Sequence, residues 1–340
     1  MSGHDILVIG TSAGGLKALT AIVGGLPAGL DAAIFIVQHL PADYLTLLPQ
    51  ILSDTGSLPA ALAKDGEPVQ KGRIYVAPAD HHLLLGRDVV HVVRGPRENR
   101  FRPSVDALFR SAARIYDGRV IGVVLSGLLD DGTVGLQAIK KRGGITVVQD
   151  PREAEFPTMP GSALRYAKVD HCLPLAGIAE LLARAPALAA APAPAPPSPA
   201  MDIEANVAEQ RMNPEQSIAG ADAIGTRTTF TCPTCNGTLW QVGEDEPARF
   251  RCHVGHSFSE VGLIAEQTRT LENALWSAVR LMEEKSVLAR RMAQRRRQAK
   301  LDEEAAVYER CAEHLDRETG AIRTLILRGF ATDLVPHQGA

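Results

Sequence analysis

The most constraining feature of this chain is a short apolar strand that turns abruptly into a helix near the N-terminus. Residues 6–9 read Ile-Leu-Val-Ile, which is typical of a buried strand, and the glycine-rich turn 10–15 follows. A helical spacing of apolar residues then includes Leu19 and Ile22. This unit predicts an α/β fold. It also places Ser12, within the turn, beside the free N–H groups that begin the helix.

Two further strand ends in the same half of the chain carry reactive side chains. The apolar run 33–37 ends just before His39, and the run 120–125 is followed by Asp131. In a doubly wound, mostly parallel sheet the carboxyl ends of the strands share one edge. We therefore expect Ser12 as nucleophile, His39 as base and Asp131 as orienting carboxylate to form an acyl-transfer triad.

Each of these residues also has a less specific interpretation. The glycine-rich turn could hold a phosphate, but a dinucleotide fingerprint needs a glycine where Ser12 stands and an acid after the second strand. His39 taken alone fits a hydrogen-bonded structural histidine, and Asp131 taken alone fits a helix cap. Their joint placement at strand ends favours catalysis. The order serine, histidine, aspartate differs from that of α/β-hydrolases.

Several segments, in order along the chain, carry a family resemblance. They are residues 9–15, 37–41, 75–82, 102–106, 125–132, 149–150 and 158–160. Through them, residues 5 to about 185 resemble the catalytic domain of CheB-type protein-glutamate methylesterases, which are carboxylic ester hydrolases of chemotaxis signal transduction. The resemblance implies hydrolysis of glutamate γ-methyl esters on chemoreceptor-type proteins with release of methanol, often with deamidation of glutamine. It assigns the family triad to Ser12, His39 and Asp131.

The residues expected to bind the oxyanion and the substrate lie in the turn after the serine and in two later loops. They are Ala13, Gly14, Gly127, Leu128 and Met159. Met159 fits a core position equally well. The family has a glycine where this chain has Leu129, which restricts the backbone there. No cofactor is expected for catalysis, and the phosphorylatable receiver domain of the family is expected to be absent.

Composition shifts predict four parts along the chain. A catalytic domain covers 1–184, a Pro/Ala-rich and then polar disordered linker covers 185–228, a zinc-ribbon-like module covers 229–259, and a helical region covers 260–330. Apolar residues in the last part follow helical spacing. The sequence leaves open whether this part is a helical hairpin or a coiled-coil arm through which two copies form a homodimer.

The third part contains a pattern typical of a metal site. Cys232 and Cys235 form a C-x-x-C turn, and Cys252 and His256 follow with a C-x₃-H spacing. Three thiolates and an imidazole complete a tetrahedral shell for structural zinc. We choose His256 over His253 because the longer spacing lets the imidazole turn inward. A disulfide or free, redox-active thiols remain the alternative.

Charge and hydropathy restrict the partners and the compartment. The formal net charge is −3, which does not favour nucleic acid, and no apolar run is long enough to span a membrane. We expect a cytoplasmic protein, without membrane insertion, that acts on methylated chemoreceptor-like proteins. The alternative function is a catalytically weak regulatory or scaffold protein whose zinc and helical tail binds a partner or nucleic acid.

Overall fold

The computed structural model describes residues 3–43, 46–191, 196–243 and 246–330. They divide into two compact units, residues 1–262 and 263–340. None of the helices in these described stretches combines the length and the apolar character that a membrane crossing requires.

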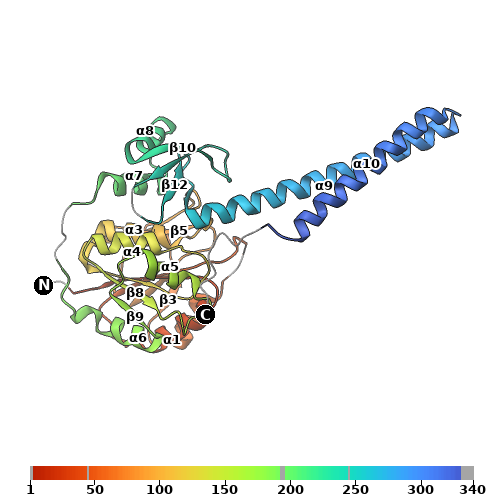
Figure 1. The fold of residues 1–340 in the computed structure, drawn as a ribbon. Helices are drawn as coiled ribbons and strands as arrows, with labels where there is room; N and C mark the ends of the chain where they lie inside the picture. The colour runs from red at the N-terminus through yellow and green to blue at the C-terminus, as the bar shows by residue number, and fades with distance from the viewer. Residues whose placement is uncertain (1–2, 44–45, 192–195, 244–245, 331–340) are drawn as a thin grey trace. The chain divides into compact units, whose positions relative to one another are not determined.

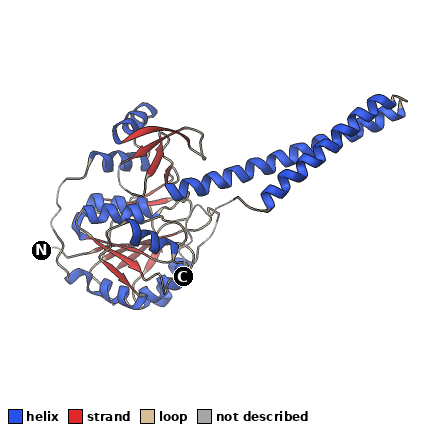
Figure 2. Cartoon of the chain, in the orientation of Figure 1, coloured by secondary structure: helices blue, strands red, loops and turns tan. Residues whose placement is uncertain are grey.

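A seven-stranded sheet organises the first unit (Figures 1 and 2). Its strands are β1 (Ile6–Thr11), β2 (Ala33–Gln38), β3 (Ala60–Leu62), β4 (Arg73–Val76), β7 (Val120–Val124), β8 (Ile145–Gln149) and β9 (His171–Leu173). The order is β3-β4-β2-β1-β7-β8-β9, and every neighbouring pair is parallel. The prediction of a mostly parallel α/β sheet is confirmed, and β1 lies between the two strands that precede His39 and Asp131.

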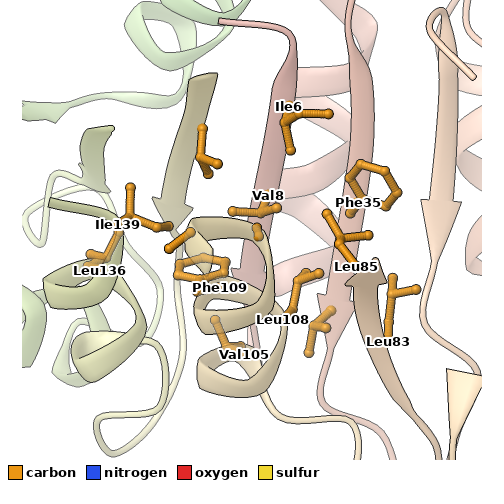
Figure 3. Close-up of a cluster of buried hydrophobic side chains, with 14 of the residues drawn as sticks. Ile6, Val8, Phe35, Leu83, Leu85, Val105, Leu108, Phe109, Leu136 and Ile139 are labelled. Atoms are coloured by element: carbon orange, nitrogen blue, oxygen red, sulfur yellow. The ribbon is translucent and has the colours of Figure 1, made fainter. Parts of the chain in front are cut away.

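Helices cover both faces of this sheet because β1 is apolar on both sides. Ile6 and Val8 point toward α3 (Val105–Tyr116), while Leu7 and Ile9 belong to the core on the opposite face. Figure 3 shows Leu108 and Phe109 of α3 packed against the sheet. The α3 face also carries α4 (Thr133–Lys141), α5 (Thr158–Tyr166) and the hairpin β5 (His82–Gly86) to β6 (Val89–Val93). The other face carries α1 (Gly15–Gly24), α2 (Leu48–Thr55) and α6 (Leu175–Arg184). Two 3₁₀ turns, η1 (Asp117–Arg119) and η2 (Ala185–Ala187), complete this part.

Two helices lie where the sequence predicts a disordered linker. They are α7 (Pro199–Ala208) and α8 (Pro214–Ile224), and each has a proline in its first turn and a side-chain N-cap, from Ser198 and Asn213. Glu204 of α7 is only 3% exposed and binds Arg249 at 2.8 Å. The structure therefore differs from the prediction over these helices, because local caps and a buried ion pair order a stretch that lacks strong apolar periodicity.

A small antiparallel sheet follows within the first unit. Its strands are β10 (Gly225–Thr231), β11 (Thr238–Val242), β12 (Arg249–Cys252) and β13 (Ser257–Ser259), paired in that order. The turn after β10 carries Cys232 and Cys235, and the turn between β12 and β13 carries His256. This sheet with its two turns is called the cysteine module below.

The second unit is a pair of long helices, α9 (Glu260–Gln298) and α10 (Asp302–Leu327). Ion pairs between Glu283 and Arg323 and between Arg297 and Glu309 show that the helices run antiparallel. Of the two arrangements left open by the sequence, the described residues therefore form a helical hairpin. Pairing of two copies through it stays a prediction.

Candidate functional site

Ser12 begins the loop between β1 and α1, and its backbone is fixed from both neighbouring strands. Its N–H donates to the Ser126 carbonyl at 3.0 Å, and Gln38 Nε2 donates to the Ser12 carbonyl at 2.7 Å. Gly14 then takes a φ of 74°, and a Cβ there would come within 2.6 Å of Ser126 Oγ. Only glycine fits this sharp turn, which leaves the Ser12 side chain partly exposed.

His39 and Asp131 are in direct contact beside this turn. His39 Nε2 lies 2.8 Å from Asp131 Oδ2, and the side chains are 3% and 0% exposed. Because an ionised carboxylate only accepts, the imidazole donates from Nε2, and Nδ1 carries the lone pair when the ring is neutral. That Nδ1 is buried and has no hydrogen-bond partner among the described residues. Ser12 and His39 line the same two surface depressions, so a substrate there would touch both.

Asp131 is held by several donors besides His39. They are Asn99 Nδ2 at 2.9 Å, Ser104 Oγ at 3.0 Å and the N–H groups of Val105 at 2.7 Å, Asp106 at 3.1 Å and Gly132 at 3.1 Å. Two of these N–H groups belong to the first turn of α3, where free donors and the helix dipole favour negative charge. Burial alone would raise the pKa of Asp131, but the hydrogen bond and charge of His39 hold it below its usual value.

The neighbouring carboxyl groups behave differently. Burial, together with the Asp131 charge, raises the pKa of Asp106 well above its usual value. Burial also raises the pKa of Asp130 to about 6, although an interaction with the Ser259 side chain opposes the shift. Asp131 is therefore the carboxyl of this group that both contacts His39 and favours the charged form that an orienting residue needs.

The loop 97–101 contributes two residues that sequence reasoning missed. The ring of Phe101 stacks on His39, with centroids 3.6 Å apart and planes inclined by 10°. Asn99 donates from Nδ2 to Asp131 at 2.9 Å and to Asp106 at 2.7 Å. No motif marks this loop in the sequence, and the resemblance covers only its neighbour, 102–106.

The expected oxyanion residues do not share one role. The N–H groups of Ala13, Gly14 and Leu128 make no hydrogen bond to another described residue, so they remain available to a ligand. The Gly127 N–H instead donates to the Phe156 carbonyl at 3.0 Å, and its place in an oxyanion hole is lost in this conformation.

Met159 does not reach the substrate surface. It is fully buried in the core on the α3 face, and a Cβ on Gly127 would meet its sulfur at 2.5 Å. Of the two roles left open by the sequence, the structure therefore places Met159 in the core beneath the Gly127 loop. Leu129 in the same loop has a φ of 64°, the left-handed conformation that glycine adopts readily. The loop thus keeps a glycine-like backbone without the glycine.

Four side chains of the cysteine module converge as the spacing predicts. The donor atoms of Cys232, Cys235, Cys252 and His256 all lie within 4.8 Å of one another. The Cys235 and Cys252 sulfurs are 3.7 Å apart, and His256 Nδ1 is 3.6 Å from the Cys252 sulfur. Zinc bond lengths in a tetrahedron imply edges of about 3.8 Å between sulfurs and about 3.6 Å from sulfur to nitrogen. The cluster therefore has the dimensions to hold a metal ion.

The protonation of the cluster also suits a metal. Hydrogen bonds with Cys252 and His256 lower the pKa of the Cys232 thiol to about 3, and this thiolate in turn raises the pKa of Cys252. A bound cation would favour the thiolate form of all three cysteines, because cysteine binds metals as the thiolate. His253 lies outside the cluster, and its ring packs edge-on against Trp240.

Comparisons with known proteins match the part of the chain that forms the seven-stranded sheet. The CheB methylesterase family model matches residues 7–182, which is more than half of the chain. The chain belongs to the CheB methylesterase family. The solved catalytic domain of Thermotoga maritima CheB methylesterase is 35% identical, with a TM-score of 0.52, and the match covers 54% of this chain and 99% of that one.

Curated relatives match over the same region. A Leptospira interrogans protein is 41% identical over 182 residues, which cover 53% of this chain and 94% of the relative. Protein-glutamate methylesterase/protein-glutamine glutaminase 2 of Methanosarcina mazei is 38% identical over 187 residues. That match covers 53% of this chain and 51% of the relative, so the chain matches about half the length of the Methanosarcina protein. The CheB resemblance read from the sequence is confirmed, while these matches leave the cysteine module and the helical hairpin unassigned.

Proposed function

We propose that this CheB-family chain hydrolyses glutamate γ-methyl esters on chemoreceptor-type proteins through Ser12, His39 and Asp131. The observation that carries the proposal is the His39–Asp131 hydrogen bond, which leaves Nδ1 as the accepting nitrogen of a histidine that lines the same depressions as Ser12. The names of the relatives supply the substrate class. Deamidation of glutamine follows the same route, with ammonia as leaving group.

The chemistry divides into two steps. His39 Nδ1 takes the proton from Ser12 Oγ as the oxygen attacks the ester carbonyl, and Asp131 stabilises the imidazolium that forms. The free N–H groups of Ala13 and Gly14 stabilise the oxyanion. The imidazolium then protonates the leaving methoxide, and methanol departs. Water, activated by the same imidazole, hydrolyses the acyl-enzyme and releases the glutamate carboxylate.

Ser12→Ala tests the proposal in a methanol-release assay on methylated receptor. We expect the variant to lose release, because no other group would carry the acyl intermediate. Ser57→Ala, at an exposed serine in the same domain, is the matched control and should retain the wild-type rate. Equal rates for wild type and a folded Ser12→Ala protein would refute the assignment.

We further propose that the cysteine module binds structural zinc. Four protein ligands would fill a tetrahedral shell and leave no open position for catalysis. The bound metal would cross-link the two turns of the cysteine module, and the triad residues would perform the ester chemistry.

A further inference from the structure

The loop 97–101 connects the two sites just described. On one side, Asn99 donates to Asp131 and Phe101 stacks on His39. On the other side, the Asn99 N–H donates to the Ser257 carbonyl at 2.7 Å, and the Ser259 N–H donates to Asn99 Oδ1 at 3.0 Å. Ser257 is the first residue of β13 and directly follows the cluster residue His256. One hydrogen-bonded path therefore runs from the cysteine cluster to the aspartate that orients His39.

The loop needs external support to keep this shape. Asn99 and Arg100 have φ values of 48° and 75°, so two successive residues other than glycine are left-handed. Each costs about 1–2 kcal/mol relative to an ordinary conformation. Backbone pairing with β13 supplies the support, because Glu98 bridges to Ser257 in the manner of a parallel strand.

A buried ion network attaches the same loop to the cysteine module. Glu98 is 2% exposed, and its carboxylate binds Arg110 of α3 at 2.6 Å and Arg251 of β12 at 3.2 Å. Glu204 of α7 lies 3.4 Å from the same Arg251 group. Burial alone would raise the pKa of Glu98, but the two guanidinium groups lower it to about 2. Removing one partner from such a buried pair leaves an uncompensated charge, so a substitution that breaks this contact between module and loop is strongly destabilising.

We propose that the cysteine module is a clamp that holds the loop 97–101 in its catalytic conformation, so that esterase turnover depends on metal bound at the distant cluster. This inference rests on the proposed function of the triad. Asn99 is a positioning residue, because it acts through Asp131. Phe101 stacks on His39 and also lines one of the depressions shared by Ser12 and His39. Metal fixes the turn that ends at His256, that turn places Ser257 and Ser259, and these two residues place Asn99.

The test uses the full chain with zinc bound and after removal of zinc by a chelator. We expect zinc removal to lower kcat by about ten- to a hundredfold with KM within about twofold, because a misplaced triad slows chemistry more than binding. The Arg251→Gln variant should also have a lowered kcat, although it still binds zinc. Arg227→Gln is the matched control, since this arginine is 61% exposed and pairs with Asp222 rather than with the loop.

Two further measurements separate a clamp from general destabilisation. In Asn99→Gly, which tolerates the left-handed backbone, kcat should already be low, and zinc removal should lower it little further, because the path is already broken. Hydrogen exchange of 97–101 should quicken when zinc is removed, while exchange of β1 and β7 stays slow. Unchanged kcat and unchanged protection of the loop without zinc would overturn the clamp, and so would equal loss of protection in β1 and β7.

The outcomes distinguish this inference from the proposed function. A wild-type chain that releases no methanol refutes the esterase assignment and, with it, the dependence of turnover on metal. An active wild type that is indifferent to zinc refutes the clamp alone.

Discussion

His39 donates its Nε2 proton to Asp131 across 2.8 Å, and both side chains are almost completely buried. The bond decides which imidazole nitrogen is free, so it sets the direction of proton transfer in the proposed reaction. Asp131 also accepts from the first turn of α3, which ties the orientation of the base to the folded core.

Asp131→Asn should lower kcat by about 10³- to 10⁴-fold with little change in KM, because a carboxamide neither fixes the tautomer of His39 nor stabilises its charged form. Steady-state methanol release measures both parameters. Asp130→Asn changes the adjacent carboxyl, which does not contact His39, and should retain most of the activity. Equal effects of the two substitutions would contradict the assignment of Asp131.

Asp130→Asn should stabilise the protein at pH 8 but not at pH 4. Burial raises the pKa of Asp130 to about 6 from a usual value of 3.8, so the folded state binds this proton more tightly than the unfolded state. In the wild type, the Asp130 carboxyl therefore lowers the free energy of unfolding as pH rises from about 4 to 6. The total decrease is about 3 kcal/mol and persists at higher pH. Urea unfolding of the wild type and of Asp130→Asn at both pH values isolates this contribution, because every other titratable group is the same in the two proteins. A gain that is the same at pH 4 and pH 8 would argue against it.

Leu129→Gly should raise the free energy of unfolding by about 0.5–1 kcal/mol. The left-handed φ of 64° costs a leucine about 1–2 kcal/mol, and the greater entropy of unfolded glycine offsets part of the gain. Thermal and urea unfolding measure the change. Leu129→Ala keeps a Cβ and should show no gain, so stabilisation by alanine as large as that by glycine would point to side-chain packing instead of backbone strain.

His256→Ala should lose zinc, whereas His253→Ala should retain it. Among the histidines that the structure describes, only His256 places a ring nitrogen among the three cysteine sulfurs, while His253 packs against Trp240. Metal analysis after gel filtration, with zinc per chain as the readout, checks the pair. Zinc retained by His256→Ala but lost by His253→Ala would reverse the choice of ligand.

The strand ends that carry the site were predictable because their signals are local. The apolar run 6–9 and the turn around Ser12 define strand, turn and helix within one short stretch. The runs before His39 and Asp131 are equally clear. The spacing of the three cysteines and His256 also marks the candidate metal cluster, because side chains on two tight turns need few distant contacts to converge.

The packing of α7 and the loop 97–101 could not be predicted in this way, although the N-caps of α7 and α8, Ser198 and Asn213, are local signals that sequence reasoning missed. Glu204 in α7 is stabilised by Arg249, which is far away in sequence. Asn99 and Phe101 look like ordinary loop residues until β13 pairs beside them. Their roles depend on contacts between segments, and propensity and periodicity contain no information about such contacts.

The sequence by itself determined the parallel α/β class, the triad candidates and the four candidate metal ligands. The class and the triad candidates follow from local strand-end signals, and the candidate ligands follow from residue types at short, fixed spacing. The tertiary structure decided that β1 lies between β2 and β7, which brings the ends of these three strands to one edge. It also decided that Asp131 rather than Asp130 contacts His39, and that β13 of the cysteine module hydrogen-bonds to the loop beside them. These outcomes depend on strand order and on buried charge pairs. Both involve interactions that form only when segments distant in sequence come into contact.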